Sequence, residues 1–441
     1  MSERAEAHEG RRGLGRRVLD RSPYRDRWRP IRFREMALLA AYSVRGVSTV
    51  TGGAAIGQFE RAFARSVGSP HALLMNSGTA ALNSAFFAAG IGPGDEVIVP
   101  SYTFYASAAA LLPLGGIPVF CEIDPDTLTA DPEDVERRIT PRTRAICVVH
   151  LWGNPAPLDR FADLAERRGL VLIEDCSHAH GATFGGRPVG TWGRIGCFSL
   201  QGSKPVSGGE AGVAITADPV LFDRMLAFGH FPRSRTDQQA GTFDIGEFSL
   251  GLKYRAHLHS AVLAHGGLKR LDELNRRRRR NYEIIGSELA GSPALQIIPE
   301  HPNATRGGFY RFILRLVAEH ATGWDRRSYV EAAARRSLPV GVDPYPPLHL
   351  EPLFAKAMWA DPVAFGRLHG DSVPIPSPSS LPVTERTCAE LVTLAPFTKL
   401  SEGKVRRCAR ALRELAESPA PDRPAGSAPR RIRDESSAAP S

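Results

Sequence analysis

The chain has 441 residues, 42% of them hydrophobic, which is enough for two or three domains with a large buried core. The formal net charge is +9, and much of the excess lies in residues 11–29, which hold eight arginines. No basic strand interleaved with aromatic residues accompanies this run, so we interpret it as a solvated tail and expect no nucleic-acid partner. No segment approaches the ~20 apolar residues of a membrane span, and we expect a cytoplasmic protein without a membrane partner.

The first two thirds of the chain alternate between strand-like and helix-like segments. Short apolar runs predict buried strands, and amphipathic spacing between them predicts helices. This alternation is typical of an α/β domain with a largely parallel sheet. Strands are predicted at 96–100, 118–122, 145–150 and 170–175, and helices at 158–168 and at 132–139, the latter with Asp131 as its N-cap.

The C-terminal part of the chain has a different pattern. One long or broken helix is predicted over 258–289, and its arginine run, 276–280, is interpreted as a solvated helix face. A strand at 310–316 and a helix at 328–336 follow. These elements predict a smaller α+β domain.

Composition sets the expected domain boundaries. We expect a large domain over 29–275 and a small C-terminal domain over 276–417. The charged start, residues 1–28, and the Pro-, Ala- and Ser-rich end, residues 418–441, are expected to be disordered, because neither has the apolar residues that a core needs.

Six cysteines occur, and no two of them form a Cys-x-x-Cys pair. Several lie in apolar, strand-like runs. This pattern predicts reduced, buried thiols rather than a disulfide framework or a zinc site. The six are Cys121, Cys147, Cys176, Cys197, Cys388 and Cys408.

A candidate phosphate cradle lies at Asn76-Ser77-Gly78-Thr79, where a turn leads into a helix. Gly78 permits close approach of a ligand to the backbone, and Thr79 can cap the helix with its hydroxyl free for an oxygen ligand. The free N–H groups and the positive end of the helix dipole favour a phosphate. The alternative is an ordinary helix N-cap.

A candidate acid, Asp175, ends an apolar strand at the edge where open α/β sheets hold ligands. A partly buried carboxylate there needs a cationic partner, which is either a protonated pyridine nitrogen or an arginine. His178 follows three residues later. It either donates a hydrogen bond to a phenolic oxygen of a cofactor or is a core histidine with internal partners.

A candidate amine, Lys204, follows an apolar run and precedes the turn at Gly208 and Gly209. A lysine forms an imine with an aldehyde only when its amine is neutral, which requires a lowered pKa. Ser199, five residues earlier, could add a hydroxyl to the phosphate cradle. Phe104 follows a strand and either stacks on a flat ring or belongs to the core. An amine, an acid and a phosphate cradle are together the parts of a pyridoxal phosphate site.

In these residues the chain resembles the DegT/DnrJ/EryC1/StrS family of pyridoxal phosphate-dependent aminotransferases. The resemblance covers about residues 29–417 and implies fold type I, a homodimer, and active sites at the dimer interface. The segments that carry it are Thr51-Gly52-Gly53, Phe59-Glu60, Ser77-Gly78-Thr79, Gly94-Asp95-Glu96-Val97, Asp175 to Gly181, Phe198-Ser199 with Lys204, and Pro347-Leu348-His349.

The resemblance also implies roles for individual residues. Lys204 is implied to form the Schiff base, Asp175 to pair with the pyridine nitrogen, and His178 to touch the phenolic oxygen. Phe104 matches the ring-stacking aromatic residue, and Thr79 and Ser199 match phosphate contacts. At Lys253 the family usually has an asparagine that reaches the phosphate of the neighbouring subunit, so this contact would require a lysine to replace an amide.

The implied activity is transfer of an amino group from L-glutamate or L-glutamine to a ketone on a sugar nucleotide or a cyclitol, in antibiotic or other secondary metabolism. Gln201 is similar to the residue of the glutamine-using cyclitol and aminohydroxybenzoate branch. Two alternatives stay open. One is another enzyme of the same fold, such as a lyase, a dehydratase or a desulfurase, and the other is a regulator that binds the cofactor without turnover.

Overall fold

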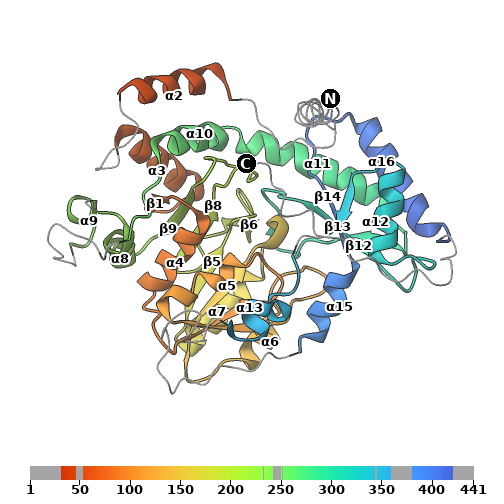
Figure 1. Cartoon of the computed structure of the whole chain (residues 1–441), viewed down its shortest axis with the longest axis horizontal. Helices are drawn as coiled ribbons and strands as arrows, with labels where there is room; N and C mark the ends of the chain where they lie inside the picture. Colours follow the sequence, from red (N-terminus) through yellow and green to blue (C-terminus); the bar gives the residue numbers. More distant parts are fainter. Residues whose placement is uncertain are drawn as a thin grey trace, which may run out of the picture.

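The computed structural model describes residues 31–45, 53–231, 233–241, 250, 252–342, 345–358 and 380–420 (Figure 1). The tail expected over 1–28 lies outside the described residues. The same holds for the tail expected over 418–441, apart from residues 418–420. Among the described residues, the structure has no helix that is both long enough and apolar enough to cross a membrane.

A seven-stranded sheet forms the centre of the large domain, in the spatial order β1-β9-β8-β5-β4-β2-β3. All neighbouring pairs from β8 to β3 are parallel, and within this sheet β9 runs against the other strands. The mostly parallel sheet confirms the predicted α/β class. Its strands are β1 (His71–Met75), β2 (Glu96–Pro100), β3 (Ile117–Cys121), β4 (Thr143–Val149), β5 (Val171–Asp175), β8 (Ile195–Ser199) and β9 (Gly212–Thr216).

Helices cover both faces of this sheet (Figure 1). Side chains alternate along each strand, so Leu74 and Ile98 enter one core while Leu73 and Val97 enter the other. The first core is closed by α3 (Gly53–Val67), α7 (Leu158–Arg168) and α10 (Leu258–Leu268), and the second by α4 (Gly78–Ala88), α5 (Ala106–Ala109) and α8 (Pro219–Gly229).

The remaining elements of this domain are short or peripheral. The helix α2 (Phe33–Arg45) packs on α10, and α6 (Pro132–Arg137) packs on α7. The predicted cap of α6 is confirmed, because the Asp131 carboxylate accepts a hydrogen bond from the Glu133 N–H at 2.9 Å. A small sheet joins β11 (Ala304–Thr305), β6 (Thr183–Phe184) and β7 (Arg187–Pro188); short helices are α9 (Arg233–Thr236), η1 (Leu112–Leu114) and η2 (Leu151–Gly153).

The C-terminal domain is built on a four-stranded antiparallel sheet in the order β10-β12-β14-β13. Three helices enclose its core, which confirms an α+β arrangement (Figure 1). The strands are β10 (Leu295–Ile297), β12 (Phe312–Leu316), β13 (Val340–Val342) and β14 (Leu391–Leu394), and the helices are α11 (Leu271–Leu289), α12 (Arg326–Arg335) and α16 (Glu402–Glu417).

The segment predicted over 258–289 as one long or broken helix is broken at Lys269–Arg270, between α10 and α11. Residues 345–355, with η3 (Leu348–Leu350) and α13 (Pro352–Ala355), return to the large domain, where Leu348 and Phe354 join its core.

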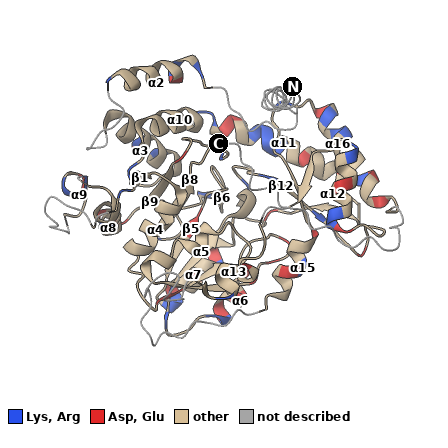
Figure 2. Ribbon diagram, in the orientation of Figure 1, with Lys and Arg blue, Asp and Glu red and all other residues tan. Residues whose placement is uncertain are grey.

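The arginine run at 276–280 is not a uniformly solvated face, as the sequence had suggested. Consecutive residues of a helix point about 100° apart, so a run of five surrounds the whole helix. Arg278 is accordingly buried and donates to the Gly308 carbonyl, while Arg277 pairs with Glu273 at the surface. On the outer helices α11, α12 and α16 charges of both signs stand side by side (Figure 2).

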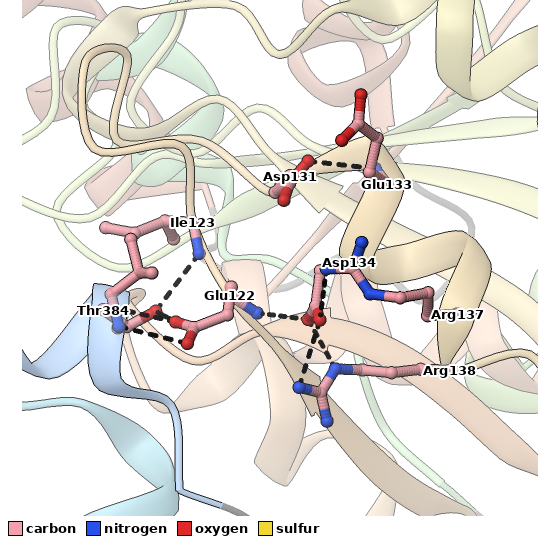
Figure 3. A network of polar contacts seen from close by, with 9 residues as sticks. Glu122, Ile123, Asp131, Glu133, Asp134, Arg137, Arg138 and Thr384 are labelled. Carbon is pink, nitrogen blue, oxygen red and sulfur yellow. Dashed lines mark hydrogen bonds and ion pairs between the residues drawn. The ribbon is translucent and has the colours of Figure 1, made fainter.

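A buried carboxylate joins the two domains (Figure 3). Glu122 directly follows β3 and accepts hydrogen bonds from the N–H groups of Val383 and Thr384 at 3.1 and 2.8 Å, in the first turn of α15 (Pro382–Glu390). The Thr384 hydroxyl donates to the same carboxylate at 2.5 Å and accepts from the Ile123 N–H at 3.1 Å. The N–H groups in the first turn of a helix have no acceptor within that helix. In α15 the large domain supplies this acceptor through Glu122.

We expect Glu122→Ala to lower the free energy of unfolding by about 3 kcal/mol, because it leaves buried N–H groups without an acceptor. Urea unfolding of the full chain, followed by tryptophan fluorescence, measures this loss. The matched control is Glu133→Ala in the same region, where the side chain is exposed and the expected change is below about 0.5 kcal/mol. Equal midpoints for the two variants would show that the Glu122 carboxylate does not stabilise the contact between the domains.

Candidate active site

A cavity of about 380 Å³ opens at the carboxyl ends of the central strands. It is the place where open α/β sheets hold ligands. Both domains contribute to its wall, since Tyr310 precedes β12 of the C-terminal domain and the other lining residues belong to the large domain or to the segment that returns to it. The other lining residues include Ser77, Gly78, Thr79, Phe104, Asp175, Ser177, His178, Ser199, Gln201, Ser203, Lys204 and Glu210.

The first turn of α4 forms one wall of the cavity. Its N-cap is Ser77, whose hydroxyl accepts from the Ala80 N–H at 3.0 Å, so the expectation that Thr79 caps the helix was wrong. Thr79 lies inside the first turn, where its hydroxyl is exposed at the cavity. The N–H groups of Gly78 and Thr79 have no acceptor within the helix at this position, so they are available to a ligand.

Gly78 brings this turn against the end of β8. A Cβ atom at Gly78 would lie 2.8 Å from Cβ of Ser199, a distance that real side chains do not adopt. Gly212 on β9 approaches the same turn, since a Cβ there would lie 2.2 Å from the Ser77 carbonyl oxygen. The two glycines therefore place the Ser199 hydroxyl beside the helix N-terminus, and together these groups form a wall suited to an anion.

Asp175 ends β5, as predicted, and its carboxylate is buried. One oxygen accepts from the Ser107 hydroxyl at 2.7 Å and the other from the Ser177 N–H at 3.0 Å. These two bonds hold the carboxylate in the cavity wall and leave it able to accept from a ligand. Sequence analysis did not find Ser107, although its position in α5, the short helix that follows β2, is a signal for a residue at the same sheet edge.

Lys204 lies in the same cavity as Asp175. Burial lowers the pKa of its amine to about 7, the nearby Asp175 carboxylate opposes this shift, and the Arg311 guanidinium adds to it. The amine is therefore protonated below about pH 7 and neutral above it. The Nζ atom lies 3.8 Å from the ring centroid of Tyr310.

His178 lies in a stack of aromatic rings. Its imidazole is buried and stacks on Tyr310 at 4.3 Å and on Trp152 at 5.0 Å, and Trp152 stacks on Tyr345 at 4.9 Å. Burial, together with the charges of Lys204 and Arg311, lowers its pKa well below the ordinary value. The imidazole is therefore neutral at pH 7, with one nitrogen that donates and one that accepts.

Two other predicted residues lie at the edge of the site. Phe104 lines the cavity with 41% of its surface exposed, and its ring lies 5.8 Å from that of Tyr345. Lys253 is exposed and is not among the residues that line the cavity. Its backbone pairs with His230, and its carbonyl accepts from the Asn76 side chain at 3.3 Å, next to the first turn of α4.

All six cysteines are buried and unbridged, as the sequence predicted. Burial raises the pKa of Cys121, Cys147, Cys176 and Cys197 well above the ordinary value, so these thiols are poor nucleophiles. A desulfurase needs a mobile, reactive cysteine, and none of the six meets this requirement.

His150, Glu174 and Cys176 lie close enough together to suggest a metal site. Glu174, however, already accepts from the N–H groups of Gly190 and Gly193 at 2.6 and 2.7 Å and lies 3.1 Å from Nε2 of His150. Nδ1 of His150 in turn accepts from a backbone N–H at 3.1 Å. The ligand atoms of Glu174 and His150 are thus used within the protein.

The fold and the cavity define a pyridoxal phosphate-dependent transferase fold of type I. The model of the DegT/DnrJ/EryC1/StrS aminotransferase family matches residues 34–413, and the chain belongs to this family.

Two relatives of this chain are aminotransferases that are named for their substrates. L-glutamine:2-deoxy-scyllo-inosose aminotransferase from Streptomyces kanamyceticus is 39% identical over 344 residues, which are 76% of this chain and 79% of the relative. L-glutamine:scyllo-inosose aminotransferase from Streptomyces griseus is 41% identical over 268 residues, 59% of this chain and 62% of the relative. Among solved structures, DesV from S. venezuelae, in complex with a ketimine intermediate, has a TM-score of 0.73 and 31% identity, and the match covers 87% of this chain and 95% of DesV.

We expect Lys204 in the cofactor-free enzyme to react with an acylating reagent with a midpoint near pH 7, because its pKa is about 7. An ordinary lysine titrates near ~10.4. Peptide mapping by mass spectrometry after brief acetylation between pH 5 and 11 gives the midpoint, with the exposed Lys404 as a reference in the same digest. A midpoint near 10 for Lys204 would contradict the desolvated site.

Proposed function

We propose that this aminotransferase moves an amino group from L-glutamine or L-glutamate to the ketone of a cyclitol such as an inosose, with pyridoxal phosphate as cofactor, in aminocyclitol antibiotic biosynthesis. The observation that carries the proposal is Lys204, whose amine has a pKa of about 7 and shares a cavity with the buried Asp175. The relatives named for L-glutamine and inososes support the substrate class.

The residues of the cavity fit pyridoxal phosphate. The N–H groups of Gly78 and Thr79 and the Ser199 hydroxyl line one wall, which suits a phosphate. Asp175 is a buried carboxylate in the cavity wall and suits a protonated ring nitrogen. Phe104 would stack on the ring, and His178 would bind its phenolic oxygen.

When bound, pyridoxal phosphate supplies an aldehyde that condenses with amines and an electron-poor ring that stabilises negative charge on the neighbouring carbon. Lys204 would hold the aldehyde carbon through its amine. With a pKa of about 7, the free Lys204 amine could both accept and donate a proton near neutral pH. Its Nζ would accept the proton from the α-carbon of the donor and would donate one to the carbon that carried the ketone.

Asp175 and His178 would orient the cofactor while Lys204 transfers protons. The Asp175 carboxylate is held by the Ser107 hydroxyl and the Ser177 N–H. His178 remains neutral because its pKa lies well below the ordinary value, so it can share a hydrogen bond without adding a positive charge beside Lys204. Of these three residues, Lys204 would be the one that accepts and donates protons.

The experiment is a product screen with the purified full chain and pyridoxal phosphate. L-glutamine and L-glutamate are each offered with scyllo-inosose, 2-deoxy-scyllo-inosose and keto-sugar nucleotides, and the aminated product is identified by mass spectrometry. We expect an aminocyclitol with at least one inosose. Lys204→Ala is the matched control and should abolish the product. Amination of keto-sugar nucleotides alone would overturn the cyclitol assignment, and release of ammonia or water without amination would favour a lyase or a dehydratase.

We also propose a homodimer in which Lys253 reaches the phosphate of the partner subunit. The side chain is exposed beside the first turn of α4 and outside the cavity of its own subunit. A lysine can bind a phosphate as a point charge. This arrangement would complete each site with a cation from the other chain.

Mixing two inactive variants tests this arrangement. If Lys253 acts across the interface, Lys253→Ala should retain pyridoxal phosphate poorly, and Lys204→Ala should be inactive. Refolding the two together should restore activity, because a hybrid dimer contains one site with both lysines intact. Full activity and normal cofactor retention of Lys253→Ala alone would remove Lys253 from the site and leave the aminotransferase assignment unaffected.

A further inference from the structure

Tyr310 connects the C-terminal domain to the candidate catalytic lysine. It lies two residues before the start of β12, and its ring forms part of the cavity wall. Nζ of Lys204 lies 3.8 Å from the ring centroid, within the range of a cation–π contact. The same ring stacks on the His178 imidazole at 4.3 Å and 27°. Tyr310 thus touches two groups of the site at once.

A chain of hydrogen bonds fixes the hydroxyl of this residue. The Ser203 hydroxyl donates to Oε1 of Gln201 at 2.6 Å, and the Ser203 N–H donates to the same oxygen at 2.8 Å. Because the only hydroxyl proton of Ser203 is used in this way, the Tyr310 hydroxyl, 2.9 Å away, must donate to Ser203. The tyrosine is therefore bound to the loop that carries Lys204.

We propose that Tyr310 is a positioning residue for Lys204: its ring holds the amine in the cavity beside Asp175, and its hydroxyl locks the ring to the lysine loop through Ser203 and Gln201. The inference rests on the proposed function only in so far as Lys204 performs the proton transfers. The C-terminal domain, which supplies Tyr310, would thereby help to position the lysine.

Several charged or titratable groups face the Lys204 amine. The Asp175 carboxylate raises its pKa and the Arg311 guanidinium lowers it. His178 is neutral at pH 7, and Glu210 lines the same cavity. An aromatic ring beneath the amine favours the ammonium form and so opposes the effect of burial. Removing the ring should therefore lower the pKa of Lys204 further.

The test compares three variants in the acylation assay and in turnover. In the cofactor-free enzyme, Tyr310→Leu should move the acylation midpoint of Lys204 down by about one pH unit, the size expected of a desolvated cation–π contact. Tyr310→Phe keeps the ring and should leave the midpoint unchanged. Tyr310→Phe and Ser203→Ala both break the hydrogen-bond chain, and each should lower kcat about tenfold with little change in KM, which corresponds to one ordinary hydrogen bond.

An unchanged midpoint in Tyr310→Leu would overturn the role of the ring, and normal kcat in both Tyr310→Phe and Ser203→Ala would overturn the role of the hydroxyl. Ser203→Ala leaves the tyrosine in place and keeps the test decisive if Tyr310→Leu does not fold. The acylation assay needs neither cofactor nor substrate, so its outcome is separate from the product screen. Failure of the wild-type enzyme to aminate inososes would overturn the proposed substrate and would leave the contact between Tyr310 and Lys204 testable.

Discussion

The parallel pairing of β5 with β8 is the constraint on which the rest of the site depends. Its register places Asp175 opposite Cys197. Ser199, two residues after Cys197 at the end of β8, therefore lies at the same edge of the sheet as Asp175. The first turn of α4 can then reach this edge only because Gly78 and Gly212 have no side chains in the way. An acid and an anion-binding turn are thereby fixed relative to each other by backbone hydrogen bonds before any ligand arrives.

Burial then determines how the groups at this edge behave. Taking an amine out of water favours its neutral form, and the pKa of Lys204 falls to about 7 although an anion lies nearby. The carboxylate of Asp175 has two hydrogen-bond donors of its own, which makes its burial tolerable. One lysine that titrates in the physiological range, beside an anion held in place, is what a reversible proton transfer requires.

The C-terminal domain completes the cavity and is tied to the sheet at two places. Glu122 binds the first turn of α15, and Ser101 binds His349, whose other ring nitrogen lies 3.0 Å from Glu385. Ser101 begins the segment that carries Phe104, so the His349 contact, with a Ser101 Oγ to Nδ1 distance of 2.6 Å, supports one wall of the site. Rigid attachment matters because Tyr310 reaches the cavity from this domain.

Local signals in the sequence, strand periodicity and turn residues, predicted the mostly parallel sheet and the position of Asp175 at a strand end. Tertiary structure brings Gly78 to the cavity that Ser199 and Lys204 also line, since Gly78 is far from them in the sequence. The sequence did not identify Ser77 as the cap, since either hydroxyl suits that position and the fit of the turn against Ser199 decides. It also missed Tyr310. An aromatic residue before a strand has no local mark of function, and only the packing of one domain on the other brings its ring to Lys204.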